Sequence, residues 1–147
     1  MNDQSIPEHY HLLDRNSRFS DLTGPFYEKI IDGKHAGIGL RVKAEHLNKV
    51  RVAHGGLIMT VADNAFGDAI LNAYDEPVSF VTMTLTCEFM SPVKEGDWLE
   101  ATVEIQRKGK RNVFANCHVN VGDKKVAFAT AIFAMVENRQ NNAGKPA

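Results

Sequence analysis

The sequence predicts an α+β domain in which an antiparallel sheet curves around one long helix. Two observations predict this class: a single apolar run of helical length covers about residues 55–74, and four segments with the two-residue period of a β-strand follow it. The chain has 147 residues, enough for one well-formed core, and no repeat or linker divides it. We therefore expect one domain over residues 1–147.

The first part of the chain predicts a helical lead and then a hairpin. Residues 1–22 are mixed and moderately helical in character, and the breaker Thr23-Gly24-Pro25 ends that stretch. Asp32-Gly33 is a common hairpin turn, and after it apolar residues alternate with small or basic ones, at Ile38, Leu40 and Val42. Two paired strands are expected here, before the long helix.

Four strands are expected after the helix, as one antiparallel run. The first alternates an apolar face with a polar one, the apolar residues being Val81, Met83, Leu85, Cys87 and Phe89. The other three cover residues 98–109, 111–122 and 124–137, and the last is apolar on both phases, which is typical of a central strand. The polar tail over residues 137–147 is expected to be flexible.

Charge and hydropathy exclude several classes of function. Lys and Arg number 17 against 18 Asp and Glu, so no global positive field would hold the chain on nucleic acid or an anionic membrane. No apolar stretch approaches the ~20 residues that cross a bilayer, and a cytoplasmic protein is expected. The histidines form no metal-ligand spacing, so no metal or other cofactor is expected. Cys87 and Cys117 lie on apolar strand phases, which predicts buried, reduced thiols.

One acid interrupts the apolar helix. The apolar residues cover nearly every direction around its axis, which predicts a helix buried all round, and yet Asp63 lies in its middle. Because burying an ionised carboxylate alone costs several kcal/mol, Asp63 should have a partner, face a cavity or take part in chemistry. A narrow solvated stripe, with Asn64 and Asp68 nearby, is the structural alternative.

His54-Gly55-Gly56 stands directly before this helix. Glycines there let another group approach the backbone, and first-turn N–H groups can donate to developing negative charge, so the motif predicts an oxyanion site or else only a tight entry turn. Gly56 and Asp63 are seven positions apart, which is about 10 Å along one helix axis. If both are catalytic at one carbonyl, they must come from two copies of the helix, as in a two-fold homodimer.

Two segments carry a resemblance to a known family. "LNKVRVAHGGLIMTVADNAFGDAI" and "TMTLTCEFMSPVKEGD" resemble the hotdog-fold acyl-CoA thioesterases, specifically the PaaI-like (phenylacetate-pathway) branch of the 4-hydroxybenzoyl-CoA thioesterase superfamily. The resemblance covers about residues 42–136. It implies hydrolysis of an acyl-CoA or aryl-acyl-CoA without a metal, by a dimer of dimers.

The same resemblance implies roles for individual residues. Asp63 would act as general base or nucleophile, while the Gly56 N–H polarises the thioester carbonyl and the neighbouring Gly55 lies against substrate. Asn48 and His54 would bind and orient the reacting groups. Thr82 stands nine residues before the Ser-Pro pair, where the family carries serine or asparagine; an ordinary threonine on the polar face of its strand, beside Thr84 and Thr86, is the alternative.

A basic cluster, Arg107-Lys108-Gly109-Lys110-Arg111, lies at a predicted hairpin turn. Such turns are usually only solvated, but the phosphates of coenzyme A need cations, so Lys108, Lys110 and Arg111 are candidate contacts for CoA. Two other functions stay open: a non-catalytic acyl-CoA-binding or scaffold protein of the same fold, and, less favoured, an acyl-thioester dehydratase. Release of free thiol from acyl-CoA separates hydrolysis from both.

Overall fold

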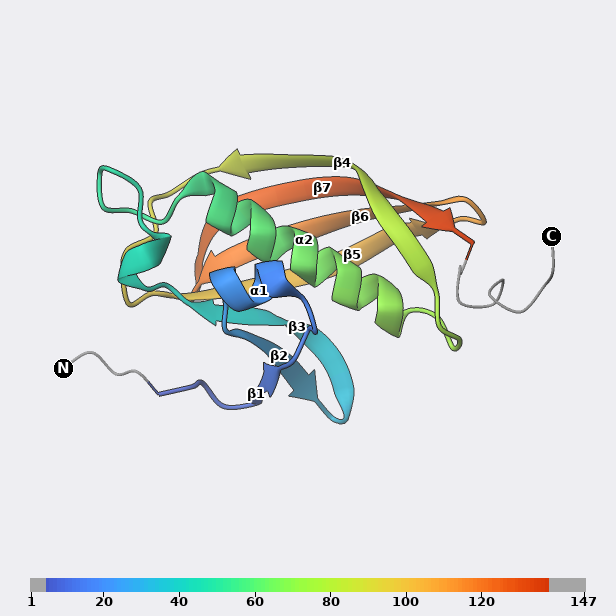
Figure 1. Cartoon of the computed structure of the whole chain (residues 1–147), viewed down its shortest axis with the longest axis horizontal. Helices are drawn as coiled ribbons and strands as arrows, with labels where there is room; N and C mark the ends of the chain where they lie inside the picture. Colours follow the sequence, from blue (N-terminus) through green and yellow to red (C-terminus); the bar gives the residue numbers. More distant parts are fainter. Residues whose placement is uncertain (1–4, 138–147) are drawn as a thin grey trace.

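The computed structural model describes residues 5–137, which form one seven-stranded antiparallel sheet and one long helix (Figure 1). The sheet order is β1-β2-β3-β5-β6-β7-β4. The strands are β1 (Tyr10–Leu13), β2 (Phe26–Ile31), β3 (Lys34–Arg41), β4 (Ser79–Phe89), β5 (Trp98–Lys108), β6 (Asn112–Val121) and β7 (Lys124–Val136). The helices are α1 (Arg18–Thr23), the 3₁₀ turn η1 (Ala44–His46) and α2 (Gly55–Asn72). The α+β prediction is confirmed.

The predicted hairpin and the central position of the last strand are also confirmed. Asp32 and Gly33 both have positive φ, 50° and 74°, which is the backbone of a two-residue turn whose twist matches the paired strands β2 and β3. Strand β7 pairs with β6 on one edge and β4 on the other, so its apolar residues on both phases belong to an interior strand.

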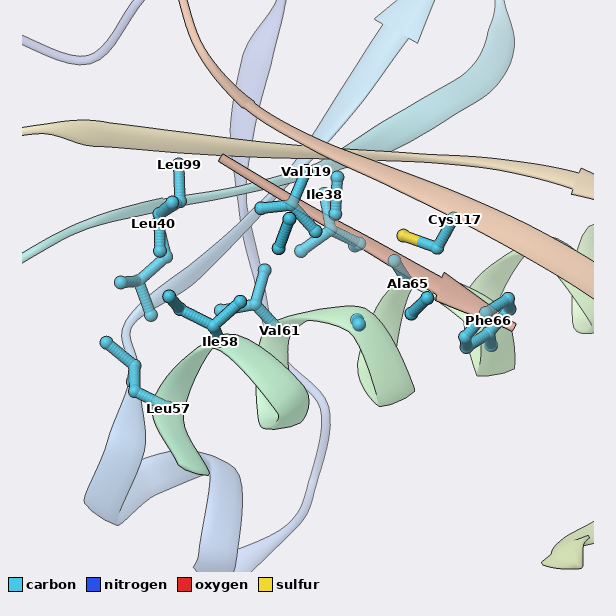
Figure 2. Packing of buried hydrophobic residues seen from close by; sticks show 14 of the residues in the cluster. Ile38, Leu40, Leu57, Ile58, Val61, Ala65, Phe66, Leu99, Cys117 and Val119 are labelled. Atoms are coloured by element: carbon cyan, nitrogen blue, oxygen red, sulfur yellow. The ribbon is translucent and has the colours of Figure 1, made fainter. Parts of the chain in front are cut away.

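Helix α2 packs against the inner face of the sheet and supplies much of the core. Figure 2 shows Leu57, Ile58 and Phe66 of α2 pointing toward side chains of β3, β5 and β6, among them Ile38, Leu40, Leu99, Cys117 and Val119. Phe66 has no exposed surface, and its truncation to alanine would cost about 3–5 kcal/mol. Between residues 5 and 137, no helix combines the length and apolar character that crossing a membrane requires.

The prediction that α2 is buried on every side is wrong for one stripe of the helix. Gly56 and Leu71 are exposed, and Asp63 is partly exposed. The cause is the open edge of the sheet: β4 is the last strand, and no other strand of residues 5–137 extends the sheet over α2 beyond it. The acid therefore avoids the full cost of burial by lying on this uncovered stripe.

The helical lead is corrected as well. Within residues 5–22, positions 10–13 form strand β1, which pairs with β2, and only residues from Arg18 onward are helical. Tertiary contact overrides local propensity there, since the buried Tyr10 packs edge-on against Trp98 with ring centroids 4.9 Å apart, and its hydroxyl donates to Glu100 at 2.5 Å. Residues 1–4, and the tail residues 138–147, lie outside the described residues.

Candidate active site

Asn48 lies in a closed loop directly before α2, residues 47–53, which we call the presenting loop. An isolated bridge between Leu47 and Ala53 closes its base. The side-chain oxygen of Asn48 accepts hydrogen bonds from the backbone N–H groups of Val50 at 3.0 Å and Val52 at 3.2 Å. In this structure, Asn48 holds the loop together, and that oxygen is occupied within the loop.

His54 caps the start of α2. Its backbone is extended, and its Nδ1 accepts the Gly56 N–H at 2.8 Å, satisfying one of the donors that a helix start leaves free. The N–H expected to polarise a carbonyl is therefore bonded to the histidine of its own motif. Both groups are exposed, so an incoming oxygen can replace the ring nitrogen if His54 rotates.

Both glycines of this motif lie close to neighbouring side chains. A Cβ on Gly56 would lie 3.0 Å from His54 Nδ1, and a Cβ on Gly55 would lie 3.3 Å from the Phe89 ring. Phe89 and Gly55 also line a cavity of about 320 Å³ beside the helix start, together with residues of the segment that follows β4, such as Pro92. The glycines thus keep the backbone accessible next to an apolar cavity.

Asp63 has one side-chain partner on the uncovered stripe. The Thr82 hydroxyl of β4 donates to Asp63 Oδ1 at 2.9 Å. The structure therefore brings together two of the residues singled out in the sequence, which are 19 positions apart. The carboxylate keeps a second oxygen and faces the free edge of the sheet, because β4 is the edge strand.

A β-bulge makes this contact possible. Thr82 lies opposite Phe133 of β7 and Thr84 lies opposite Ile132, so Met83 is an extra residue in β4. Directly opposite residues share a face of the sheet, so Thr82 shares the inner face with the buried Phe133, while Thr84 faces outward. The strict alternation predicted from Val81 onward is wrong at this point, and Thr82 does not share the face of Thr84.

The separation of Gly56 from Asp63 along the helix is the one that the sequence predicts. Both belong to the single helix α2, seven residues and about 10 Å apart along its axis. Within one chain, the acid with its threonine and the helix start with its histidine are therefore two separate groups, which we call the half-sites of the candidate active site.

The basic turn lies near the other end of α2. Lys108 Nζ donates to the Ala73 carbonyl at the helix terminus at 2.9 Å and stands 4.6 Å from the centre of the Tyr74 ring. Its ammonium is thus engaged in the fold, as a cation at a helix C-terminus. Lys110 and Arg111 are exposed in the turn between β5 and β6. All three basic candidates are exposed, and Lys108 is the one whose ammonium already contacts the end of α2.

Sequence reasoning missed the bulge at Met83 and the burial of His46, which directly precedes the presenting loop. The described residues hold no cluster of three or more His, Cys, Asp or Glu side chains that could bind a metal ion. The prediction of a buried thiol is confirmed for Cys117, whose pKa burial raises to about 12, and Cys87 is half-buried.

The family model described as the thioesterase superfamily matches residues 51–128, which contain the helix start, Asp63 and Thr82. The chain belongs to this superfamily. As a superfamily member it is a thioester hydrolase, and the predicted hotdog fold and PaaI-like branch are confirmed.

Two relatives show how far the likeness extends. The Pseudomonas aeruginosa protein PA0474, whose name assigns it provisionally to the esterases, is 33% identical over 129 residues, covering 88% of this chain and 96% of the relative. Acyl-coenzyme A thioesterase PaaI of Escherichia coli is 32% identical over 98 residues, covering 66% of this chain and 68% of PaaI.

Two solved structures share the fold. Escherichia coli PaaI superposes with a TM-score of 0.69 at 22% identity, covering 84% of this chain and 87% of that one. The BH2602 protein of Bacillus halodurans, solved with CoA, gives a TM-score of 0.64 at 24% identity and covers 69% of this chain and 68% of its own.

Proposed function

We propose that this thioester hydrolase acts on acyl-CoA or aryl-acyl-CoA, with Asp63 as the base and the Gly56 N–H as the oxyanion donor. The contact between Thr82 and Asp63 carries the proposal: a carboxylate held at 2.9 Å by a hydroxyl, on the only stripe of α2 that the sheet leaves uncovered among the described residues. The names of the PaaI relative and of the CoA-bound BH2602 structure support the substrate class.

The reaction needs a base and a donor. Asp63 takes a proton from a water molecule as the water oxygen adds to the thioester carbon, and the carbonyl oxygen gains negative charge. The Gly56 N–H, at the positive end of α2, donates to that oxygen in place of His54 Nδ1. The C–S bond then breaks, and the thiolate of CoA leaves and takes up a proton. Thr82 holds the carboxylate toward the water.

The substrate would span the two half-sites. The cavity beside Gly55 and Phe89 would take the part of the substrate next to the thioester, because its wall is apolar and it adjoins the helix start. Lys110 and Arg111 would hold the phosphates of CoA, since their side chains are exposed. Asn48 would act indirectly, by keeping the presenting loop closed.

The two half-sites imply a homodimer. Strand β4 is an 11-residue edge strand whose apolar side chains Val81 and Met83 are 53% and 59% exposed. Such a long apolar edge pairs with other chains unless it is covered, and a second copy related by a two-fold axis would cover it. That copy would bring its own Gly56 to this chain's Asp63. Two such dimers would form the tetramer that the resemblance implies.

Thiol release from a panel of acyl-CoA substrates, followed with a chromogenic disulfide in the presence of a chelator, tests the activity. Asp63→Asn should lower kcat at least about 100-fold, because an amide is neither a base nor a useful nucleophile. Asp75→Asn, which changes an exposed acid just beyond α2, is the matched control and should retain kcat. Wild-type turnover by Asp63→Asn would remove Asp63 from the mechanism.

Mixing two inactive chains tests the composite site. Asp63→Asn and Gly56→Pro, which lacks the N–H, are each expected to be inactive. After subunit exchange, half of the dimers contain one chain of each kind, and one of their two sites carries no lesion. About a quarter of the wild-type activity should therefore return. If both variants fold and exchange but the mixture stays inactive, the acid and the donor act within one chain.

A further inference from the structure

His46 is a buried histidine, with 6% of its surface exposed. Both of its ring nitrogens have partners: Nδ1 accepts the backbone N–H of Lys43 at 2.9 Å, and Nε2 lies 2.7 Å from the carbonyl oxygen of Thr23. An N–H can only donate and a carbonyl can only accept, so the ring is neutral and carries its proton on Nε2. The imidazole thus joins η1 to the last residue of α1.

The backbone of His46 connects η1 to the candidate active site. Its carbonyl accepts the His54 N–H at 2.9 Å, directly beside the bridge between Leu47 and Ala53 that closes the presenting loop. On the other side, Ala53 N–H donates to the Val93 carbonyl at 2.7 Å. His46 and Val93 therefore anchor the base of the loop that ends in His54, the cap of α2.

Helix α1, which the His46 ring contacts at Thr23, is itself held in place. Ser17 caps the start of helix α1, and its hydroxyl accepts the Ser20 N–H at 3.4 Å. Just before it, Arg15 pairs with Asp68 of α2 at 2.5 Å, and both side chains are largely buried. The hydrogen bond from His46 to Thr23 closes this path, because it connects the end of α1 back to the loop at the start of α2.

We propose that His46 is a positioning residue: through Thr23 it makes the N-terminal segment β1–α1 a support for the loop that sets His54 and the start of α2. This inference rests on the proposed function, because it assigns His46 an effect on the helix start that would polarise the carbonyl. A misplacement of such a group by a fraction of an ångström to 1 Å is enough to reduce turnover strongly.

Two substitutions separate the two hydrogen bonds of the ring. In His46→Asn the amide oxygen stands where Nδ1 stood, which keeps the bond from Lys43 and loses the one to Thr23. In His46→Gln the amide nitrogen stands where Nε2 stood, which keeps the bond to Thr23. Each variant loses one buried hydrogen bond, so both should show a similar drop in Tm. If the link to Thr23 positions the loop, kcat should fall about tenfold more in the asparagine variant than in the glutamine variant, with KM within about twofold.

A double-mutant cycle checks that α1 transmits the effect. Ser17→Ala weakens the start of α1 and should lower kcat modestly in the wild-type background but not in the His46→Asn background, where the link is already broken. His11→Asn, an exposed histidine on β1, is the control and should leave kcat unchanged.

Equal kcat values for the asparagine and glutamine variants, or kcat losses that follow Tm in both, would overturn the inference. Additive effects of Ser17→Ala and His46→Asn would overturn it as well. A wild-type protein that releases no thiol from any acyl-CoA would instead count against the proposed function, so the two failures are distinguishable.

Discussion

Replacing Thr82 by valine removes one hydroxyl from the candidate active site and little else. Valine keeps the branched shape and the strand preference of threonine, so the bulge and the packing against β7 should remain. The lost group is the donor at 2.9 Å from Asp63 Oδ1. Without it, we expect the carboxylate to rotate more freely and, in the proposed mechanism, to point less often at the attacking water.

The size of the effect follows from the kind of bond and its exposure. A hydrogen bond to a charged group contributes about 1.5–3 kcal/mol when buried, but Thr82 is exposed and water replaces part of the loss. We expect about 1–2 kcal/mol in transition-state stabilisation, which is about a 5- to 30-fold decrease in kcat. KM should change little, because Thr82 does not touch the groups proposed to hold CoA.

The assay is thiol release from the best acyl-CoA substrate, with Tm measured on the same preparations. Thr84→Val is the matched control: it makes the same chemical change two positions along β4, on the outer face. It should keep kcat within about twofold of wild type. Equal losses in the two variants, or wild-type kcat in Thr82→Val, would refute the role of the bulge in presenting Thr82 to the acid.

Two further predictions concern the basic turn and the buried thiol. Lys110→Ala or Arg111→Ala should raise KM severalfold with little change in kcat, and the difference in KM from the parent should shrink at high salt. Lys108→Ala should mainly lower Tm, because Lys108 contacts Ala73. A KM that is the same for mutant and parent at both salt concentrations would mean that the turn is only solvated. The folded chain keeps the Cys117 proton up to about pH 12, whereas the unfolded chain releases it from about pH 9. The free energy of unfolding should therefore fall across that window by up to about 1.4 kcal/mol per pH unit. In denaturant titrations, Cys117→Ala should lose less stability over the same pH range, and an equal slope would contradict the raised pKa of Cys117.

Local pattern was enough to find the helix and its acid. The apolar run of α2, the glycine pair before it and the single carboxylate inside it are neighbours in sequence, so their spacing alone placed Gly56 and Asp63 on one helix two turns apart. The hairpin at Asp32-Gly33 was equally local. What could be predicted of the site was the part in which a few adjacent residues define the geometry.

The rest depends on contacts between segments far apart in sequence. The inward direction of Thr82 is set by register with Phe133, 51 positions later, and alternation within β4 alone predicts the opposite face. The ring of His46 bonds to the backbone carbonyl of Thr23, and because every residue has such a carbonyl, the sequence does not reveal this contact. Lys108 is a plausible phosphate contact until the end of α2 is seen beside it.

The extra residue at Met83 affects how strand β4 should be aligned between relatives. One inserted residue decides which side chain turns toward Asp63, so the hydroxyl that contacts this acid is set by the number of residues in β4 as much as by their identity. A relative without the insertion would present a different position of its strand to the acid, even with the same letters in the column of Thr82. Alignments of this segment are therefore best anchored on the partner strand, and a one-residue deletion here would alter the chemistry while leaving the composition of the strand almost unchanged.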